Sequence, residues 1–310
     1  MSDNVYDVAI VGAGPAGLTV ALYCGRANLS TIVFGNIYDS QIAKAGDIRN
    51  YPGIDSIQGV DLIEKFQNQA EQYNMAVVPS NVTRAVPGEI FTLYSDVNEF
   101  KARSVVIATG SKHSDLNIPG EKEYTYKGVS YCSICDGNLY KGKIVALVGN
   151  GDQAAKAALY LSGLCEEVIA LTDKPDIDSP MYFEQIKTKG NIRIIGGAHV
   201  IAIEGGEIVE RLKFRSNDGP EEVIGVEAVF IEGGIPNTLL AGELGLALDD
   251  NGNIGVSCPG HSTNIEGVFA AGDVTGGVHQ VSKAVGDGAS AAMSAILYVK
   301  KLKKGEDKSN

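Results

Sequence analysis

Two glycine-rich motifs lie 137 residues apart in this chain, and they limit the folds it can adopt more than any other feature. Each motif follows a short apolar run and precedes a helix-like segment, which is the strand–turn–helix context of a dinucleotide-binding unit. In that context the glycines allow a sharp turn and bring a pyrophosphate to the helix N-terminus. The motif positions are Gly12, Gly14 and Gly17 in G-x-G-x-x-G, and Gly149, Gly151 and Ala154 in G-x-G-x-x-A.

The length of 310 residues and the order of the predicted elements favour two domains. A strand is predicted at 144–148, before the second motif, and a helix after it as far as Leu161. Alternating strand and helix signals around both motifs predict two doubly wound, Rossmann-like α/β domains with parallel sheets. Further buried strands are expected within 102–110 and 267–274, and a helix over 284–299.

The end of the second strand in each unit indicates which nucleotide is held. Asp173 stands about twenty residues beyond the second motif, where a carboxylate accepts a hydrogen bond from a ribose 2′-hydroxyl and repels a 2′-phosphate. This position favours NADH over NADPH. In the first unit the segment 31–36 ends without an acid, so its ribose contact is unassigned. Two sites in one chain suggest one resident and one visiting cofactor, and a bound flavin dinucleotide is a natural relay to a disulfide.

Cys132 and Cys135 are separated by two residues and admit three interpretations. Structural zinc requires four ligands, of which one C-x-x-C supplies two, and the histidines show no paired spacing. A permanent disulfide across two residues closes a very small loop and restrains the unfolded chain little. A redox pair is better supported, because a helix N-terminus stabilises the thiolate that carries out disulfide exchange.

Asp136 follows the pair directly. Reducing a disulfide requires protons, and a carboxyl group beside the thiols could deliver one to the departing thiolate. Asp136 could instead serve as the N-cap of a helix, and the two roles are compatible. The remaining cysteines, Cys24, Cys165 and Cys258, lie in apolar contexts and are expected to be inert core residues.

The charge balance excludes two classes of partner. The chain has 26 basic and 38 acidic residues, and its net charge of −12 repels nucleic acid and anionic membrane surfaces. Its apolar runs are shorter than a membrane-spanning helix requires, and its first residues do not resemble a signal peptide. A cytoplasmic location is expected. The charged stretch 300–310 is expected to be a solvated, frayed end.

Six motifs together resemble one family, the low-molecular-weight thioredoxin reductases, which are pyridine nucleotide-disulfide oxidoreductases. The similarity extends from about Tyr6 to Val299 in the family's order. Its most specific element is C-x-x-C-D-G just before the second nucleotide motif. The motifs are GAGPAG, Ala108-Thr109-Gly110, CSICDG, GNGDQA, GGIPNT at 233–238, and AAGDV.

The resemblance implies a role for each residue of the redox centre and a domain arrangement. Cys135 would lie against the flavin and form the charge-transfer thiolate, Cys132 would attack the disulfide of thioredoxin or a thioredoxin-like protein, and Asp136 would be the acid/base. A nucleotide domain at about 116–246 would be inserted into an FAD domain formed by 1–115 and 247–310. The inserted domain would rotate as a body, and the protein would be a homodimer.

The resemblance also implies the cofactor-binding residues, with no metal. For FAD they are Gly12, Gly14, Pro15, Ala16, Gly17, Gln41, Asn50, Thr109, Gly110, Gly272, Asp273, His279, Gln280 and Val281, of which Asp273 would bind the ribityl chain. For a nicotinamide nucleotide they are Gly149, Gly151, Asp152, Gln153 and Ala154, to which the position at the end of the second strand adds Asp173.

Departures from the family pattern bear on the electron donor. NADPH-dependent relatives carry an arginine cluster where this chain reads Leu-Thr-Asp-Lys at 171–174, so NADPH is disfavoured. Positions 39–42, Arg49-Asn50 and His279-Gln280 also differ from the family pattern. The alternatives are a donor other than NADPH (NADH, ferredoxin or deazaflavin), a ferredoxin–NAD(P) reductase-like enzyme, which normally lacks the cysteine pair, and a flavin redox sensor that binds partners.

Overall fold

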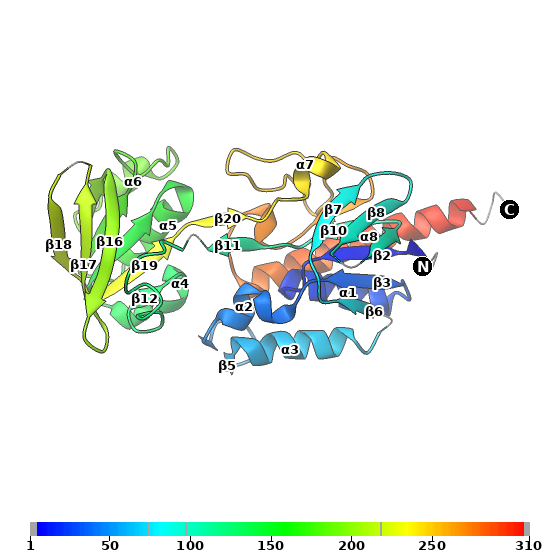
Figure 1. Cartoon of the computed structure of the whole chain (residues 1–310), viewed down its shortest axis with the longest axis horizontal. Helices are drawn as coiled ribbons and strands as arrows, with labels where there is room; N and C mark the ends of the chain where they lie inside the picture. Colours follow the sequence, from blue (N-terminus) through cyan, green and yellow to red (C-terminus); the bar gives the residue numbers. More distant parts are fainter. Residues whose placement is uncertain (1–4, 74, 97, 114, 218, 307–310) are drawn as a thin grey trace. The chain divides into compact units, whose positions relative to one another are not determined.

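The computed structural model describes residues 5–73, 75–96, 98–113, 115–217 and 219–306 (Figure 1). The chain forms two compact units, one made of Met1–Lys112 and Pro236–Asn310 and the other of His113–Ile235. The chain passes between them at two short strands that pair with each other, β11 (Ser111–His113) and β20 (Gly234–Pro236). The second unit is therefore an insertion in the first.

The return to the first unit occurs about eleven residues earlier than the sequence predicted. Leu240, Leu244 and Leu246 are buried in the core of the first unit. The side chain of Glu243 accepts a hydrogen bond from the backbone N–H of Ala85 in the same unit (2.7 Å). Residues 236–246 therefore belong with the first unit, because their apolar side chains pack there.

The first unit contains a parallel sheet, helices that cover it and an antiparallel sheet. Its strands are β1 (Val5–Tyr6), β2 (Val8–Val11), β3 (Thr31–Phe34), β4 (Asp47–Ile48), β5 (Ile57–Gln58), β6 (Met75–Val78), β7 (Val82–Val86), β8 (Phe91–Ser95), β9 (Glu99–Ala102), β10 (Val105–Ile107) and β21 (Val268–Ala270). Its helices are α1 (Pro15–Arg26), η1 (Ile37–Asp39), α2 (Gln41–Lys44), α3 (Gly59–Ala70), α7 (Ala241–Leu244), η3 (Asp273–Thr275) and α8 (Val281–Glu306).

The parallel sheet of the first unit has the strand order β21-β10-β2-β3-β6. Its central strands are apolar on both faces, as in β2, where all four residues are buried, because both faces are covered. Helices α1, α3 and α8 share one core with the sheet, and β7, β8 and α7 share another core with the opposite face. Figure 1 shows α1 and α3 on the same side of this sheet.

Helix α8 corrects the prediction for the C-terminal tail. It runs through Glu306, so most of the stretch expected to fray is helical. Lys303 forms an ion pair with the buried carboxylate of Asp7 (2.8 Å), and Arg103 pairs with Glu306. These ion pairs hold the last turns of α8 against the first strands, which explains why the helix continues beyond Val299.

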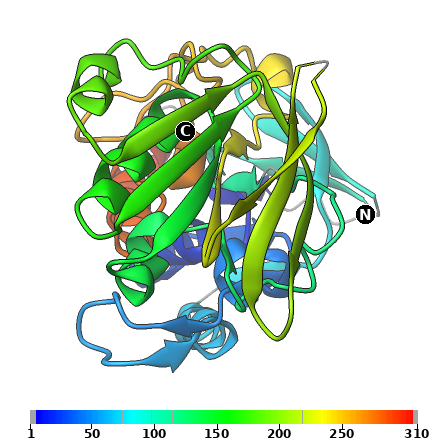
Figure 2. The ribbon, with the colours of Figure 1, turned by 90° about the vertical axis from the view of Figure 1, so that its left-hand side faces the viewer.

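The second unit has the same plan in three layers (Figure 2). A parallel sheet of order β12-β19-β13-β14-β15 lies between a helical layer and the antiparallel sheet β16-β17-β18. Both units thus confirm the predicted α/β class, with an antiparallel sheet in place of helices on one face. The elements are β12 (Val129–Ser130), α4 (Ser133–Asp136), η2 (Gly137–Tyr140), β13 (Ile144–Gly149), α5 (Gly151–Ser162), β14 (Glu167–Thr172), α6 (Phe183–Lys187), β15 (Ile192–Gly196), β16 (Ala198–Gly205), β17 (Val209–Ser216), β18 (Glu221–Gly225) and β19 (Ala228–Glu232).

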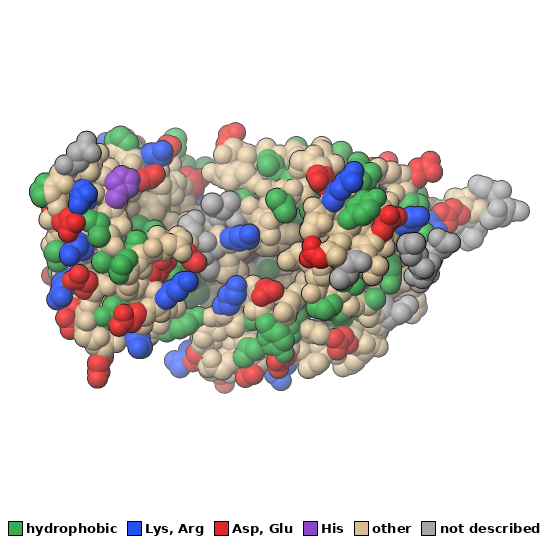
Figure 3. Space-filling view, in the orientation of Figure 1, with side chains coloured by type: hydrophobic (Ala, Val, Ile, Leu, Met, Phe, Trp, Pro, Cys, Tyr) green, Lys and Arg blue, Asp and Glu red, His purple; other side chains and the backbone are tan. Residues whose placement is uncertain are grey.

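The outer face of β16–β18 is covered by ion pairs between neighbouring strands. Arg211 on β17 pairs with Glu204 on β16 (2.7 Å), and Arg215 on β17 pairs with Glu221 on β18 (3.0 Å). Acidic and basic side chains accordingly lie next to one another on the part of the surface visible in Figure 3. None of the described helices is long and apolar enough to cross a membrane.

Candidate active site and cofactor sites

The first glycine motif is shaped by close backbone packing. A Cβ added to Gly12, whose φ is +118°, would lie 2.1 Å from the carbonyl oxygen of Ala108. One added to Gly17 would lie 1.9 Å from the carbonyl oxygen of Gly12. By contrast, a Cβ on Gly14 meets no atom within 4 Å. The motif is therefore tight at its first and third glycines and open at the second, which fits the close approach of a pyrophosphate.

Helix α1 begins directly at this opening. Gly14 is its N-cap residue and Pro15 its first residue, where the missing N–H of proline costs no helical hydrogen bond. Ala16 in the first turn is buried. An added Cβ on Gly272 would lie 3.0 Å from the Cβ of Ala16, so the glycine that precedes Asp273 lies against the start of α1.

The remaining residues predicted to bind FAD are linked by hydrogen bonds within the first unit. Ser111, just after Thr109 and Gly110, donates to Asp273 (3.4 Å), and Gln41 donates to the carbonyl oxygen of Ser111 (2.7 Å). Thr109 donates to the carbonyl oxygen of Asn237 (2.6 Å). These contacts bring Gln41, the 109–111 segment and the Gly272–Asp273 turn together, as a dinucleotide site of several segments requires.

Asn50 and the residues just before α8, which were also predicted to bind FAD, contact each other. The side-chain amide of Asn50 donates to Gln280 (2.9 Å), although 230 residues separate them. Gln280 directly precedes α8, and its carbonyl oxygen accepts the N–H of Ala284. Val281 packs against the core, and His279 is partly buried beside it.

Two residues on α8 hold the Gly272–Asp273 turn and were not predicted from the sequence. Lys283 donates to the carbonyl oxygens of Gly272 (3.1 Å) and Gly276 (2.6 Å). Asp287 accepts the N–H of Gly272 (3.1 Å) and pairs with Lys283 (2.7 Å). The i, i+4 spacing of Lys283 and Asp287 places both on one face of the helix, which is the signal that could have indicated them.

Beyond the end of β3, where the ribose contact is unassigned, a carboxylate lies on helix α3. A cavity of about 270 Å³ beyond β3 is lined by residues that include Gly35, Asn36 and Tyr38, and Glu64 on α3 also lines it. Tyr38 donates a hydrogen bond to Glu64 (2.9 Å). The strand end thus has no acid of its own, and the carboxylate that lines this cavity is one that no local pattern in the sequence indicates.

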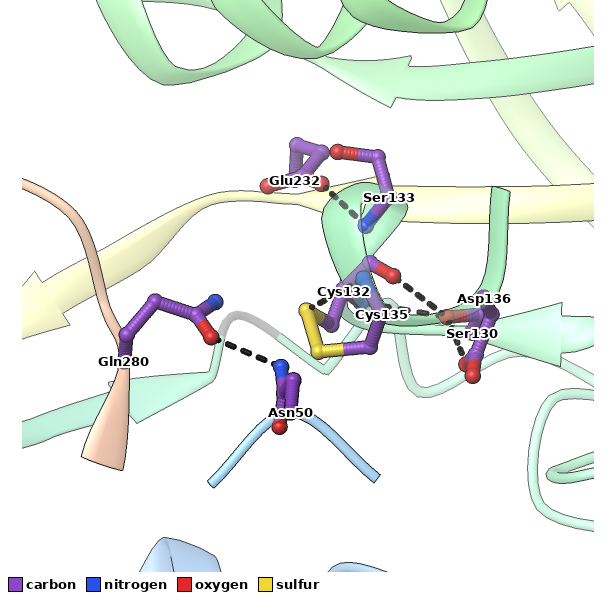
Figure 4. The surroundings of a disulfide bond; sticks show 8 residues. All are labelled: Asn50, Ser130, Cys132, Ser133, Cys135, Asp136, Glu232 and Gln280. Carbon is purple, nitrogen blue, oxygen red and sulfur yellow. Dashed lines mark hydrogen bonds between the residues drawn. A yellow bond between two sulfur atoms is a disulfide. The ribbon is translucent and has the colours of Figure 1, made fainter. Parts of the chain in front are cut away.

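In the second unit, Cys132 and Cys135 form a disulfide, which contradicts the zinc interpretation (Figure 4). Cys132 is the N-cap residue of α4, and the backbone N–H of Cys135 donates to its sulfur (3.2 Å). A helix-end amide aimed at this sulfur favours the thiolate once the disulfide is opened. The pair has the geometry of a redox centre.

Asp136 lies at the far end of the same short helix. Its carboxylate accepts a hydrogen bond from the hydroxyl of Ser130 (2.6 Å), and that hydroxyl also accepts the N–H of Cys132 (3.1 Å). Asp136 precedes η2 in the N-cap position, but its side chain makes no capping hydrogen bond. The side chain thus contacts the polypeptide around the cysteines through Ser130.

The second glycine motif follows the redox pair, and its polar side chains form hydrogen bonds with another segment of the same unit. A Cβ on Gly149 would lie 2.0 Å from the carbonyl oxygen of Glu232, whereas Gly151 has open space around it. The side chain of Asn150 accepts the N–H of Asp178 (2.8 Å), and Asp152 accepts a hydrogen bond from the buried Ser179 (2.6 Å). The segment after β14 therefore bonds to two polar side chains of the motif, Asn150 and Asp152.

The other residues predicted to hold a nicotinamide nucleotide lie on the expected elements. Gln153 and Ala154 belong to the first turns of α5, with Ala154 fully buried. Asp173 is exposed and directly follows β14. Gly151 thus offers room for a phosphate, but a dinucleotide would have to share Asn150 and Asp152 with the 174–182 segment.

The remaining three cysteines were predicted to be core residues, and this is wrong for one of them. Cys24 and Cys165 are buried, but Cys258 is exposed, because it lies in a loop outside the cores of the unit. Burial, with a smaller contribution from Asp7, raises the pKa of Cys24 to about 12. Burial also raises the pKa of Cys165.

We expect these thiols to differ sharply in reactivity. Iodoacetamide at pH 9 should alkylate Cys258 within minutes and leave Cys24 unmodified, because only about one Cys24 thiol in a thousand is then ionised and none is accessible. Mass spectrometry of tryptic peptides measures both sites. Denatured protein is the control and should react at both. Equal rates in the native protein would contradict the buried position of Cys24.

Two Rossmann-like units with a glycine motif each, and a disulfide at the start of a short helix, define an oxidoreductase that acts on a disulfide. The family model described as pyridine nucleotide-disulphide oxidoreductase matches residues 6–288, and the chain belongs to that family. Membership implies FAD and a pyridine nucleotide as cofactors.

Individual relatives agree with the predicted resemblance. The chain is 36% identical over 308 residues to a thioredoxin reductase of Listeria monocytogenes, with 97% of this chain and 96% of that protein covered. A solved thioredoxin reductase from Giardia duodenalis has a TM-score of 0.89 at 32% identity and covers 96% of this chain and 100% of that one. A ferredoxin-flavin thioredoxin reductase from Clostridium acetobutylicum has a TM-score of 0.54 at 34% identity, with 97% and 99% covered.

Proposed function

We propose that this chain is an FAD-dependent thioredoxin-disulfide reductase. Electrons pass from a reduced donor through FAD to the Cys132–Cys135 disulfide, and from there to thioredoxin or a thioredoxin-like protein. The observation that carries this proposal is the disulfide at the N-cap of α4, in the inserted unit and just before the second glycine motif. The names of the relatives support the choice of substrate.

The two units have different tasks in this proposal. The first binds FAD at the opening beside Gly14, and the second carries the redox pair and the nicotinamide nucleotide motif. FAD, when bound, supplies electrons singly or in pairs. We further propose a homodimer in the reducing cytoplasm, where a C-x-x-C pair is more often catalytic than structural.

The chemistry of the cysteine pair follows from its contacts. Two electrons break the Cys132–Cys135 bond, and the N–H of Cys135 stabilises a thiolate on Cys132. This thiolate attacks one sulfur of the partner's disulfide, forms a mixed disulfide and expels a partner thiolate. Cys135 then attacks the sulfur of Cys132, which restores the original disulfide and releases the second partner thiolate. Asp136, linked to Cys132 through Ser130, is the proposed acid/base that exchanges protons with these sulfurs.

The second unit favours NADH over NADPH as the donor. A cavity of about 480 Å³ is formed by the segment that follows Asp173 and bonds to the glycine motif. Its ionisable lining residues are Lys174, Asp176, Asp178 and Glu184. Three carboxylates against one ammonium group disfavour the extra phosphate of NADPH, and Asp173 lies next to them.

A donor other than a nicotinamide nucleotide is the second candidate. The 174–182 segment occupies Asn150 and Asp152, and a relative of similar fold is a ferredoxin-flavin thioredoxin reductase. A reduced ferredoxin or a deazaflavin would need no site at this motif. A flavin redox sensor with no donor is the third candidate, and the intact redox pair argues against it.

Anaerobic titration of the FAD-reconstituted protein tests these donors. We expect NADH to bleach the flavin absorbance at least about tenfold faster than NADPH at equal concentration, because the acidic lining penalises the 2′-phosphate. Stopped-flow absorbance near 450 nm is the measurement. Faster reduction by NADPH would contradict the donor assignment. If neither reduces the flavin, reduced ferredoxin is expected to do so, and failure of all three donors would support the sensor.

A further inference from the structure

Glu232 connects the second glycine motif with the redox helix, and its side chain had no assigned role. It is the last residue of β19, a strand whose other residues, Ala228 to Ile231, are buried and apolar. It pairs in parallel register with Gly149, the last residue of β13. A Cβ on Gly149 would collide with the Glu232 carbonyl at 2.0 Å, so the two strand ends are held closely together.

The carboxylate of Glu232 reaches the start of α4. Its Oε1 accepts the backbone N–H of Ser133, the first residue of that helix, at 3.0 Å. Ser133 is only 3% exposed and follows Cys132 directly. The amides at the start of α4 are therefore divided between two acceptors, with Ser133 bonded to Glu232 and Cys135 to the sulfur of Cys132. Figure 4 shows Glu232 at the beginning of the helix and Asp136 at its other end.

The surroundings of this carboxylate favour its protonated form. Burial raises the pKa of Glu232, and the hydrogen bonds from Ser133 lower it by a smaller amount. No second charge contributes to the shift. The charged groups on the elements that pack against β19 are Asp136 on α4, Asp152 and Lys156 on α5, and Glu210, Arg211, Lys213 and Arg215 on β17.

We infer that Glu232 is a positioning residue that sets the dithiol–disulfide equilibrium of Cys132 and Cys135 through its charge and its hold on the start of α4. When ionised, it places a negative charge next to the residue that must become a thiolate. That charge disfavours the thiolate and so favours the disulfide, which makes the reduced pair a stronger reductant. When Glu232 takes up a proton, its negative charge is lost and the thiolate is no longer disfavoured.

The inference deepens the proposed function, but its test needs neither the physiological donor nor thioredoxin. FAD-reconstituted protein is equilibrated with glutathione redox buffers from pH 5 to pH 9. Alkylation and mass spectrometry then give the fraction of Cys132 and Cys135 in the disulfide. A failed donor titration would leave this measurement unaffected, so the two proposals can fail separately.

We expect Glu232→Gln to shift the equilibrium about tenfold toward the dithiol at pH 8, which corresponds to about 30 mV for a two-electron couple. The shift should shrink as the pH falls and Glu232 becomes protonated in the unmodified protein. Glu227→Gln is the matched control, because Glu227 stands just before β19 at its opposite end and pairs with Lys143. It should change the equilibrium less than twofold.

Two results would overturn the inference. In one, Glu232→Gln and Glu227→Gln give the same equilibrium at every pH. In the other, the shift caused by Glu232→Gln is independent of pH, as expected for a purely structural contact. Glu232→Asp keeps the charge and should stay within threefold of the unmodified protein. If Glu232→Gln does not fold, the unmodified protein is compared with Glu232→Ala between pH 5 and pH 8. A shift of the unmodified protein toward the disulfide that is tenfold beyond the shift of Glu232→Ala would support the inference, and the absence of this difference would refute it.

Discussion

Replacing either Cys132 or Cys135 by serine is expected to lower the rate of thioredoxin-type disulfide reduction by at least about 1,000-fold. A serine hydroxyl cannot form a disulfide, so electrons cannot be stored on the pair that the structure shows bonded. Binding of FAD should be unaffected, because the residues around the Gly14 opening belong to the other unit. Thiol release from an oxidised thioredoxin, with the donor in excess, measures the rate.

The two variants should differ in what they trap. In Cys135→Ser, Cys132 keeps its sulfur and should remain joined to a thioredoxin as a mixed disulfide, because the resolving thiol is absent. In Cys132→Ser no such adduct should form, and the long-wavelength absorbance of a Cys135 thiolate beside the flavin should persist. Non-reducing electrophoresis and visible spectra distinguish the two variants. The opposite pattern would exchange the proposed roles of the cysteines.

Cys258→Ser is the control for both variants. Cys258 is exposed and lies outside the disulfide, so its loss should change the rate less than twofold. A large loss of activity in this variant would show that the exposed thiol takes part in the reaction. Retained activity in Cys132→Ser or Cys135→Ser would remove the disulfide from the proposed electron path.

The features that the sequence predicted correctly are local ones. A glycine whose neighbours forbid a Cβ, such as Gly12 or Gly149, marks a turn between a strand and a helix, and the adjacent apolar runs indicate the elements on either side. Helix α5, predicted to reach Leu161, ends at Ser162. The α/β class and the redox pair follow from patterns of this kind, because each depends on fewer than about thirty consecutive residues.

The features that could not be predicted depend on contacts between distant segments. Glu64 reaches the end of β3 from α3, and Lys283 holds a turn that precedes its own helix. Lys303 keeps the end of α8 helical by pairing with Asp7, almost three hundred residues away. Glu232 resembles any acid at a strand end until its bond to Ser133 is known. In each case the partner is chosen by tertiary packing, which no spacing within the sequence indicates.

Substitutions at the first glycine motif should separate binding of FAD from folding. Gly14→Ala is expected to destabilise the protein by less than about 1 kcal/mol, because the added methyl group meets no protein atom within 4 Å and the residue has an ordinary backbone conformation. It should nevertheless weaken FAD binding by at least about tenfold, because the space it fills is the one through which a pyrophosphate approaches the helix.

Gly17→Ala is the matched variant, with the same added methyl group three residues later. That methyl would lie 1.9 Å from the carbonyl oxygen of Gly12 and force α1 away from β2, at a cost of about 2–3 kcal/mol or more. Thermal unfolding of the apoprotein and FAD titration by fluorescence quenching measure the two effects separately. Gly14→Ala should lose affinity with little change in melting temperature, and Gly17→Ala should lose both. Unchanged FAD affinity in Gly14→Ala would place the flavin elsewhere, because the opening at the start of α1 is the part of the motif that the fold leaves clear.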